Sequence, residues 1–112
     1  MDRQRYISVP KDLKSMEKYY YVEETNEDMI EWILSENEFI SLFDSGIFNL
    51  LNNQCELLID DFESETIGFN KLVLAETTIN NFQRNSNNKE IEHLHNLILE
   101  VIKRGTQISF DF

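Results

Sequence analysis

The chain has 112 residues and a formal net charge of −11, and 41% of its residues are hydrophobic, among them eight Phe, four Tyr and one Trp. A chain of this length buries about two thirds of its unfolded surface, so we expect one domain over residues 1–112, and the aromatic content excludes a disordered chain. The single cysteine, Cys55, excludes an internal disulfide framework and is typical of a reducing compartment.

The start of the chain gives no sign of a targeting segment. The first residues, MDRQRYISVPKDLK, lack the apolar core of a signal peptide. No apolar run in the chain approaches the ~18–20 residues that span a bilayer. We therefore expect a cytoplasmic protein without a membrane segment.

Two stretches near the start contain the residue types of β-strands. Arg5 to Val9 alternates weakly and precedes Pro10, which predicts a short strand that ends there. Residues 17–24, EKYYYVEE, are rich in strand formers and are predicted as a second strand. The alternative for this stretch is a helix that continues from Asp12.

Residues 25–36, TNEDMIEWILSE, have the pattern of an amphipathic helix. Thr25 or Asn26 would cap it, and the acids that follow suit the positive end of the helix dipole. The predicted buried stripe is Met29, Ile30, Ile33 and Leu34.

Two short helices are predicted next, over residues 37–44 and 47–54. Ser45 and Gly46 are expected to end the first helix and to separate it from the second.

Residues 55–67, CELLIDDFESETI, allow two structures. They are either a strand that enters an acidic turn or a further helix. In both cases we expect Ile59, Phe62 and Ile67 to anchor the stretch to the core while its carboxylates stay outside.

The last third of the chain has the clearest periodicity. Helices are predicted over residues 70–85 and 87–105, and Gly105 suits the left-handed position that ends a helix. Residues 107–112 then alternate apolar and polar side chains, which predicts a half-buried strand. The sequence as a whole predicts an α+β fold, mostly helical, with a small sheet of short strands that includes this C-terminal strand.

All of the excess negative charge lies in residues 19–70, which contain thirteen Asp and Glu and no Lys or Arg. We call this stretch the base-free segment, and IDDFESETI at residues 59–67 is its densest part. Contacts to nucleic acid need clustered basic residues, so direct nucleic acid binding is disfavoured. Self-repulsion in the segment would be relieved by a partner of opposite charge.

We therefore predict that a basic protein docks on this segment. Acidic side chains would meet its charge, and a tryptophan would serve as an apolar anchor. The predicted partner-binding residues are Asp60, Asp61, Glu63, Glu65, Glu56, Asp44, Glu31 and Trp32.

Metal binding and catalysis are less favoured. The carboxylates of residues 60–65 lack the glycine of a calcium loop. His93 and His95 would point roughly 200° apart on a helix and cannot share a metal. Cys55 lies among acids, where the pKa of a thiol is not lowered. We predict no cofactor, no metal site, no catalytic residue and no small-molecule substrate, and hence a protein that is not an enzyme.

Residues 45–67, SGIFNLLNNQCELLIDDFESETI, resemble small bacterial immunity proteins, the partners of contact-dependent growth inhibition and related polymorphic toxins. The shared pattern is a Gly-x-Phe turn at Gly46 and Phe48, then Asn52, an apolar triplet at 57–59 and an Asp-Asp-aromatic-Glu run at 60–63. The resemblance implies neutralisation of a toxin domain, often a nuclease, by occlusion of its active site or a neighbouring surface. It implies no fixed binding residues, so the predicted contacts depend on charge alone.

Three functions follow as hypotheses. The first is an immunity protein that forms a heterodimer with a basic toxin domain and blocks its substrate groove. The second is a DNA mimic or regulatory inhibitor of a nucleic-acid-binding protein, which would space its carboxylates like phosphates. The third is a small enzyme, which would need a cleft that holds a carboxylate pair beside Cys55 or a histidine.

Overall fold

The computed structural model describes residues 4–20 and 29–112, with the backbone only for residues 17–20. Four antiparallel strands form one sheet in the order β2-β1-β4-β3. They are β1 (Arg5–Pro10), β2 (Met29–Leu34), β3 (Ser64–Ile67) and β4 (Ile108–Asp111). The C-terminal strand β4 thus lies inside the sheet, between β1 and β3.

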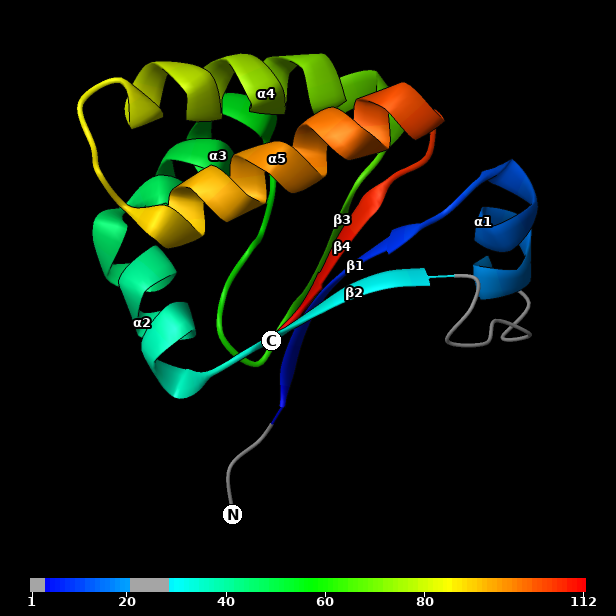
Figure 1. Cartoon of the computed structure of the whole chain (residues 1–112), viewed down its shortest axis with the longest axis horizontal. Helices are drawn as coiled ribbons and strands as arrows, with labels where there is room; N and C mark the ends of the chain where they lie inside the picture. The colour runs from blue at the N-terminus through cyan, green and yellow to red at the C-terminus, as the bar shows by residue number, and fades with distance from the viewer. Residues whose placement is uncertain (1–3, 21–28) are drawn as a thin grey trace.

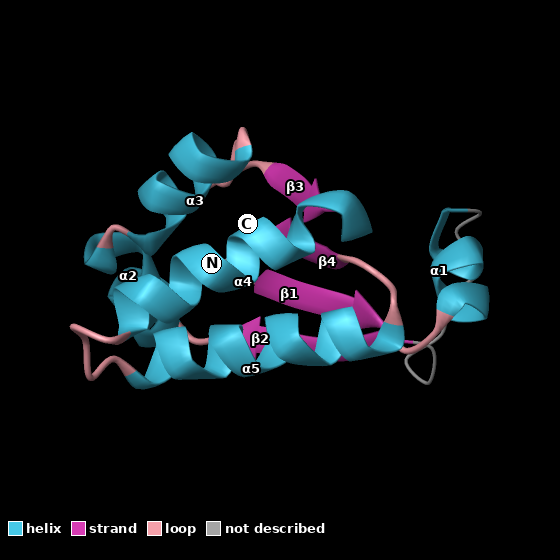
Figure 2. Ribbon diagram, turned by 90° about the horizontal axis from the view of Figure 1, so that it is seen from above, coloured by secondary structure: helices cyan, strands magenta, loops and turns pink. Residues whose placement is uncertain are grey.

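Five helices accompany the sheet in the described part of the chain. They are α1 (Leu13–Tyr20), α2 (Glu36–Ser45), α3 (Ile47–Cys55), α4 (Phe69–Gln83) and α5 (Lys89–Arg104). Helices α3, α4 and α5 lie on one side of the sheet, and α1 lies off the end that is remote from α2 (Figures 1 and 2). The fold is α+β, as the sequence predicts. None of the helices described has both the length and the apolar character that a membrane crossing requires.

Alternation along the strands decides which side chains meet the helices. Ile108, Phe110 and Phe112 are buried in the core, which confirms the predicted C-terminal strand. Their neighbour Ser109 faces the other side of the sheet, where its hydroxyl lies 2.9 Å from that of Thr66 on β3. On the face away from the helices, Ser8, Ser109 and Thr66 thus lie side by side on β1, β4 and β3.

The predicted helix over residues 25–36 is wrong where the structure describes it, because Met29–Leu34 forms strand β2. Ile30, Trp32 and Leu34 turn toward the helices, whereas Glu31 and Ile33 are exposed. These residues also fit helical spacing. Pairing with β1 along its full length decides the outcome, since β1 would otherwise lack a partner on that side. The expected cap and first turn, residues 25–28, lie outside the described residues.

The alternative for residues 17–24 is the correct one as far as the structure describes them. Helix α1 continues to Tyr20, so residues 17–20 are helical rather than extended. Residues 21–24 lie outside the described part of the chain.

The remaining helices match their predictions within a few residues, and α5 has the caps expected at both of its ends, whereas α4 begins after Gly68 without a side-chain cap. Ser35 and Glu38 form a reciprocal capping box at the start of α2. Gly46 separates α2 from α3 with φ +88°, and Gly105 ends α5 with φ +71°, backbone angles that glycine adopts without steric cost. The side chain of Asn88 caps α5 through the N–H groups of Glu90 and Ile91.

An aromatic cluster packs at the end of the sheet near α2 and α3. The ring of Phe112 lies 5.1 Å from that of Phe39 and 5.4 Å from that of Phe48, between ring centres. Phe110 and Phe43 extend the cluster through Phe48. This cluster supports the loop between α3 and β3, which carries the densest acidic stretch.

Candidate docking surface

The stretch between α3 and β3 forms neither the strand that enters an acidic turn nor the further helix that the sequence allows. Leu57 to Asp60 is extended without regular pairing, a tight turn follows, and only Ser64–Ile67 is a strand. In the turn, the N–H of Glu63 donates to the carbonyl of Asp60 at 3.3 Å. The expected strand that enters an acidic turn is therefore wrong, because the only regular strand of this stretch follows the turn; the expected further helix is wrong as well.

Phe62 occupies the third position of this turn with φ +64°. A bulky side chain rarely adopts this left-handed conformation, which favours Gly or Asn. The side chain of Phe62 is 80% exposed, so its expected role as a core anchor is wrong. Ile59 and Ile67 are 3% and 0% exposed, and they do anchor the stretch.

Asn52 on α3 holds the extended part of the loop. Its side-chain amide donates to the carbonyl of Ile59 at 2.9 Å and accepts the N–H of Ile59 at 2.8 Å. Glu65 holds Leu58, the residue before Ile59, because the carboxylate of Glu65 accepts the N–H of Leu58 at 2.8 Å. Two polar side chains thus satisfy the backbone of a segment that no strand pairs with.

Arg5 on β1 holds the turn itself. Its guanidinium donates two hydrogen bonds of 3.2 Å to Asp61 and one of 2.7 Å to Glu36, and it lies 4.0 Å from the ring centre of Phe39. The hydrogen bonds to Asp61 raise the pKa of the guanidinium, although burial opposes them. Asp61 therefore turns toward a base from outside the base-free segment, which charge counting along the chain does not reveal.

The C-terminus completes the support of the loop. The N–H of Phe112 donates to the carbonyl of Glu63 at 3.1 Å, and the ring of Phe112 belongs to the aromatic cluster. Loop positions 58, 59, 61 and 63 are thus each fixed by a partner on a different element. The turn is consequently ordered before any partner arrives.

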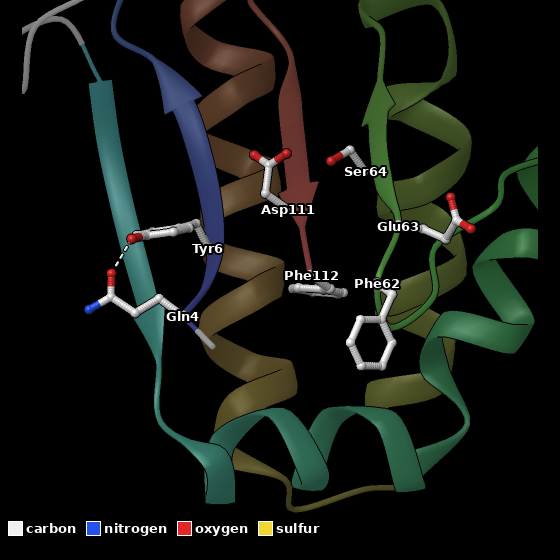
Figure 3. A pocket seen from close by; sticks show the side chains of 7 residues that line it. All are labelled: Gln4, Tyr6, Phe62, Glu63, Ser64, Asp111 and Phe112. Carbon is white, nitrogen blue, oxygen red and sulfur yellow. Dashed lines mark hydrogen bonds between the residues drawn. The ribbon is translucent and has the colours of Figure 1, made fainter. Parts of the chain in front are cut away.

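Two shallow depressions flank the turn, and Glu63 lines both. One, of about 380 Å³, lies between the loop and helices α2 and α3; its lining includes Phe43, Leu58 and Asp60. The other, of about 370 Å³, lies at the end of the strands, where Phe62 and Phe112 meet side chains of β1, β3 and β4 (Figure 3).

Large apolar side chains stand beside these carboxylates. Leu58 is 77% exposed, Phe62 is 80% exposed and Phe43 is 38% exposed. The residues on either side of Leu58 are buried: Leu57 is 5% exposed and Ile59 is 3% exposed. The predicted surface is therefore apolar as well as acidic. Leu58 was missed because an apolar triplet indicates core, and Phe62 was missed because it was expected to be an anchor in the core.

The structure brings only some of the predicted partner-binding residues together. Asp60 and Glu63 are exposed and line the same depression, and Asp44 and Glu56 are exposed on the neighbouring elements. Asp61 and Glu65 are half-buried and bond to the protein itself. Glu31 is exposed on β2, at the opposite edge of the sheet from β3, and does not belong to this surface.

Trp32 is not available on the surface. It is 8% exposed, its ring lies 3.9 Å from that of His93, and its Nε1 donates to Glu38 at 3.4 Å. Its predicted role as an exposed anchor is wrong, because alternation on β2 turns it toward the helices.

Groups with catalytic or metal-binding capacity lie apart. His95 meets Glu76 at 2.9 Å, whereas His93 stacks on Trp32. Cys55 is buried, and burial raises the pKa of its thiol. In the described ranges, no three His, Cys, Asp or Glu side chains gather as they would around a metal ion.

The chain matches no protein-family model, and comparisons with curated proteins and with solved structures find no match. The geometry and charge of the surface around the turn therefore carry the functional conclusion.

Proposed function

We propose that this chain is a cytoplasmic bacterial immunity protein that binds and neutralises a basic toxin domain, a nuclease, and that it has no enzymatic activity of its own. The observation that carries the proposal is the turn at residues 60–63, where exposed carboxylates and exposed apolar side chains lie together on a loop held by hydrogen bonds to other elements. Such a combination is typical of an interaction surface with a charged rim.

The mechanism is competition for a cationic groove. Asp60 and Glu63 occupy the positions where the phosphates of the toxin's substrate would bind, and they pair with its Lys and Arg side chains. The net charge of −11 attracts the basic domain at long range, so that association is fast and slows as salt rises.

The residues that carry the resemblance support this proposal, because several of them build the loop. Gly46 provides the left-handed backbone between α2 and α3, and Phe48 is 2% exposed in the aromatic cluster. Asn52 holds Ile59 through two hydrogen bonds.

The DNA-mimic alternative receives less support. A phosphate mimic needs carboxylates in a regular extended row without large apolar side chains between them. Here Phe62 separates Asp61 from Glu63, and Asp61 is bound to Arg5.

The test uses the C-terminal domain of the protein encoded directly upstream of this chain's gene. Co-expression of this chain should restore growth of cells that express that domain, and the purified pair should form a 1:1 complex. If the upstream domain is not toxic, or if this chain neither binds it nor protects, the proposal is wrong.

A further inference from the structure

We propose that Leu58 and Phe62 form the apolar centre of the docking surface, and that the depression beside Leu58 receives an arginine side chain of the partner. The inference rests on the proposed function and specifies the partner's chemistry. It begins from a contrast within the loop. Half-buried side chains, Asn52 and Arg5, hold Ile59 and Asp61 in place, whereas two of the loop's largest apolar residues are 77% and 80% exposed.

The apolar and acidic groups form one continuous surface. Phe43, Leu58, Asp60 and Glu63 line the depression of about 380 Å³, and Glu63 and Phe62 line the neighbouring one. We call these five residues the loop surface. Phe43 is fixed in place by its ring contact with Phe39, at 5.4 Å between centres.

Folding stability alone does not explain the residues at the two exposed positions. Glycine would adopt φ +64° without strain, and a polar residue would suit a side chain that is 77% exposed. Phe62 and Leu58 add little to the core, yet the clamps from Asn52 and Arg5 keep the backbone that carries them in one conformation. A partner that buries them has little loop ordering to offset.

Charge decides the kind of partner. A second copy of the chain would place Asp60 and Glu63 against like charges, which opposes self-association through this surface. A basic surface with an apolar recess is complementary in both respects. Arginine fits the depression because its stem can lie along Leu58 and Phe43 while its planar guanidinium meets the carboxylates.

Arg5 shows this arrangement within the molecule. Its guanidinium lies over the ring of Phe39 at 4.0 Å and binds the carboxylate of Asp61 with two donors. The depression on the other side of the loop offers the same groups, a phenyl ring and carboxylates, in Phe43, Asp60 and Glu63.

The first experiment measures the affinity of single variants for the upstream-encoded toxin domain. Phe62→Ala and Leu58→Ala should each weaken binding about tenfold or more, as truncation of buried anchors does. The chain offers matched controls on α4: Phe69 is 54% exposed and Leu74 is 46% exposed, and neither lines a depression beside the turn. Phe69→Ala and Leu74→Ala should change the affinity less than about threefold. Equal effects from both pairs would overturn the inference.

Phe62→Gly separates contact from loop order. It removes the ring but relieves the left-handed strain, so the unfolding temperature should stay the same or rise while the affinity falls as much as in Phe62→Ala. If the affinity of Phe62→Gly equals that of the unchanged chain, the ring is not a contact and the inference is wrong.

The second experiment does not need the toxin. Blocked tetraarginine and tetralysine peptides are titrated into the isotope-labelled full chain, and amide chemical shifts are recorded. Tetraarginine should perturb residues 43 and 58–63 first and at lower concentration than tetralysine. Equal shifts from both peptides, spread over all exposed acids, would contradict the arginine site.

The two experiments distinguish failure of the inference from failure of the proposed function. Tight toxin binding that ignores Phe62 and Leu58 overturns the inference alone. A selective tetraarginine response without any toxin binding overturns the proposed function and leaves the arginine site supported.

Discussion

Arg5 joins the turn to β1 and to the start of α2 through Asp61 and Glu36. It is the only base that the structure places against Asp61 among the described residues, and its side chain is 13% exposed. Its three donors and the ring of Phe39 match a planar guanidinium, which an ammonium cannot reproduce.

Arg5→Lys should therefore lower the free energy of unfolding by about 1 kcal/mol and Arg5→Met by about 2 kcal/mol, measured by urea denaturation. Arg84→Lys is the control, because Arg84 is exposed at the end of α4. It should change stability by less than about 0.5 kcal/mol. Equal stability of Arg5→Lys and the unchanged chain would show that the turn does not depend on the guanidinium.

Residue-level prediction from the sequence worked where one local rule applied. Ile59 and Ile67 are buried as expected, because apolar residues beside acids belong to the core in most folds. The same rule predicted that Phe62 is buried. Phe62 is exposed instead, because its place in the turn directs its side chain outward. The ion pair between Arg5 and Asp61 joins residues 56 positions apart, and local sequence carries no signal for it.

At the scale of elements, helices were predictable and strand pairing was not. Caps and periodicity are local, so the bounds of α4 and α5 could be predicted to within a few residues. Gly105 ends α5 as expected, whereas α4 begins after Gly68 without a side-chain cap. Strand β2 was missed because Met29–Leu34 satisfies helical spacing, and the partner that makes it a strand lies at Arg5–Pro10.

The capping box of α2 gives a prediction for acid unfolding. The N–H of Ser35 donates to the carboxylate of Glu38 at 2.8 Å, and this bond holds the pKa of Glu38 below its usual value of 4.5. A carboxyl with a lowered pKa in the folded state stabilises the protein above its unfolded pKa, and this contribution is lost as pH falls through the folded pKa.

Between pH 6 and pH 3, the unchanged chain should lose more free energy of unfolding than Glu38→Gln, which has no proton to take up. Chemical denaturation at a series of pH values measures the difference, and Glu92→Gln, an exposed first-turn acid of α5, is the control. Parallel pH profiles for Glu38→Gln and the unchanged chain would contradict the assigned role of the box.

For the whole molecule, charge segregation is the property that the sequence showed most directly, although it did not show how the charge is arranged. The sheet order places Glu31 and the turn at opposite edges, and Arg5 neutralises part of the densest stretch. Of the acids predicted to bind the partner, Asp60 and Glu63 are exposed and line one depression. Folding thus concentrates the predicted surface into fewer residues than the sequence indicated.

The net charge of −11 should also make stability depend on salt. Self-repulsion opposes the compact state, and the screening length falls from about 30 Å at 0.01 M salt to about 8 Å at 0.15 M. The unfolding temperature should therefore rise over this range of sodium chloride. A fall would mean that attractive pairs such as Arg5–Asp61 outweigh the repulsion.

The most direct test of the central claim is the association rate constant with the upstream-encoded toxin domain at low salt. We predict that Asp60→Asn with Glu63→Gln slows association about tenfold, and that Glu31→Gln with Glu92→Gln, which removes the same charge elsewhere, slows it less than about threefold. Equal rates for the two double variants, or a rate that does not fall as salt is added, would contradict docking through the turn.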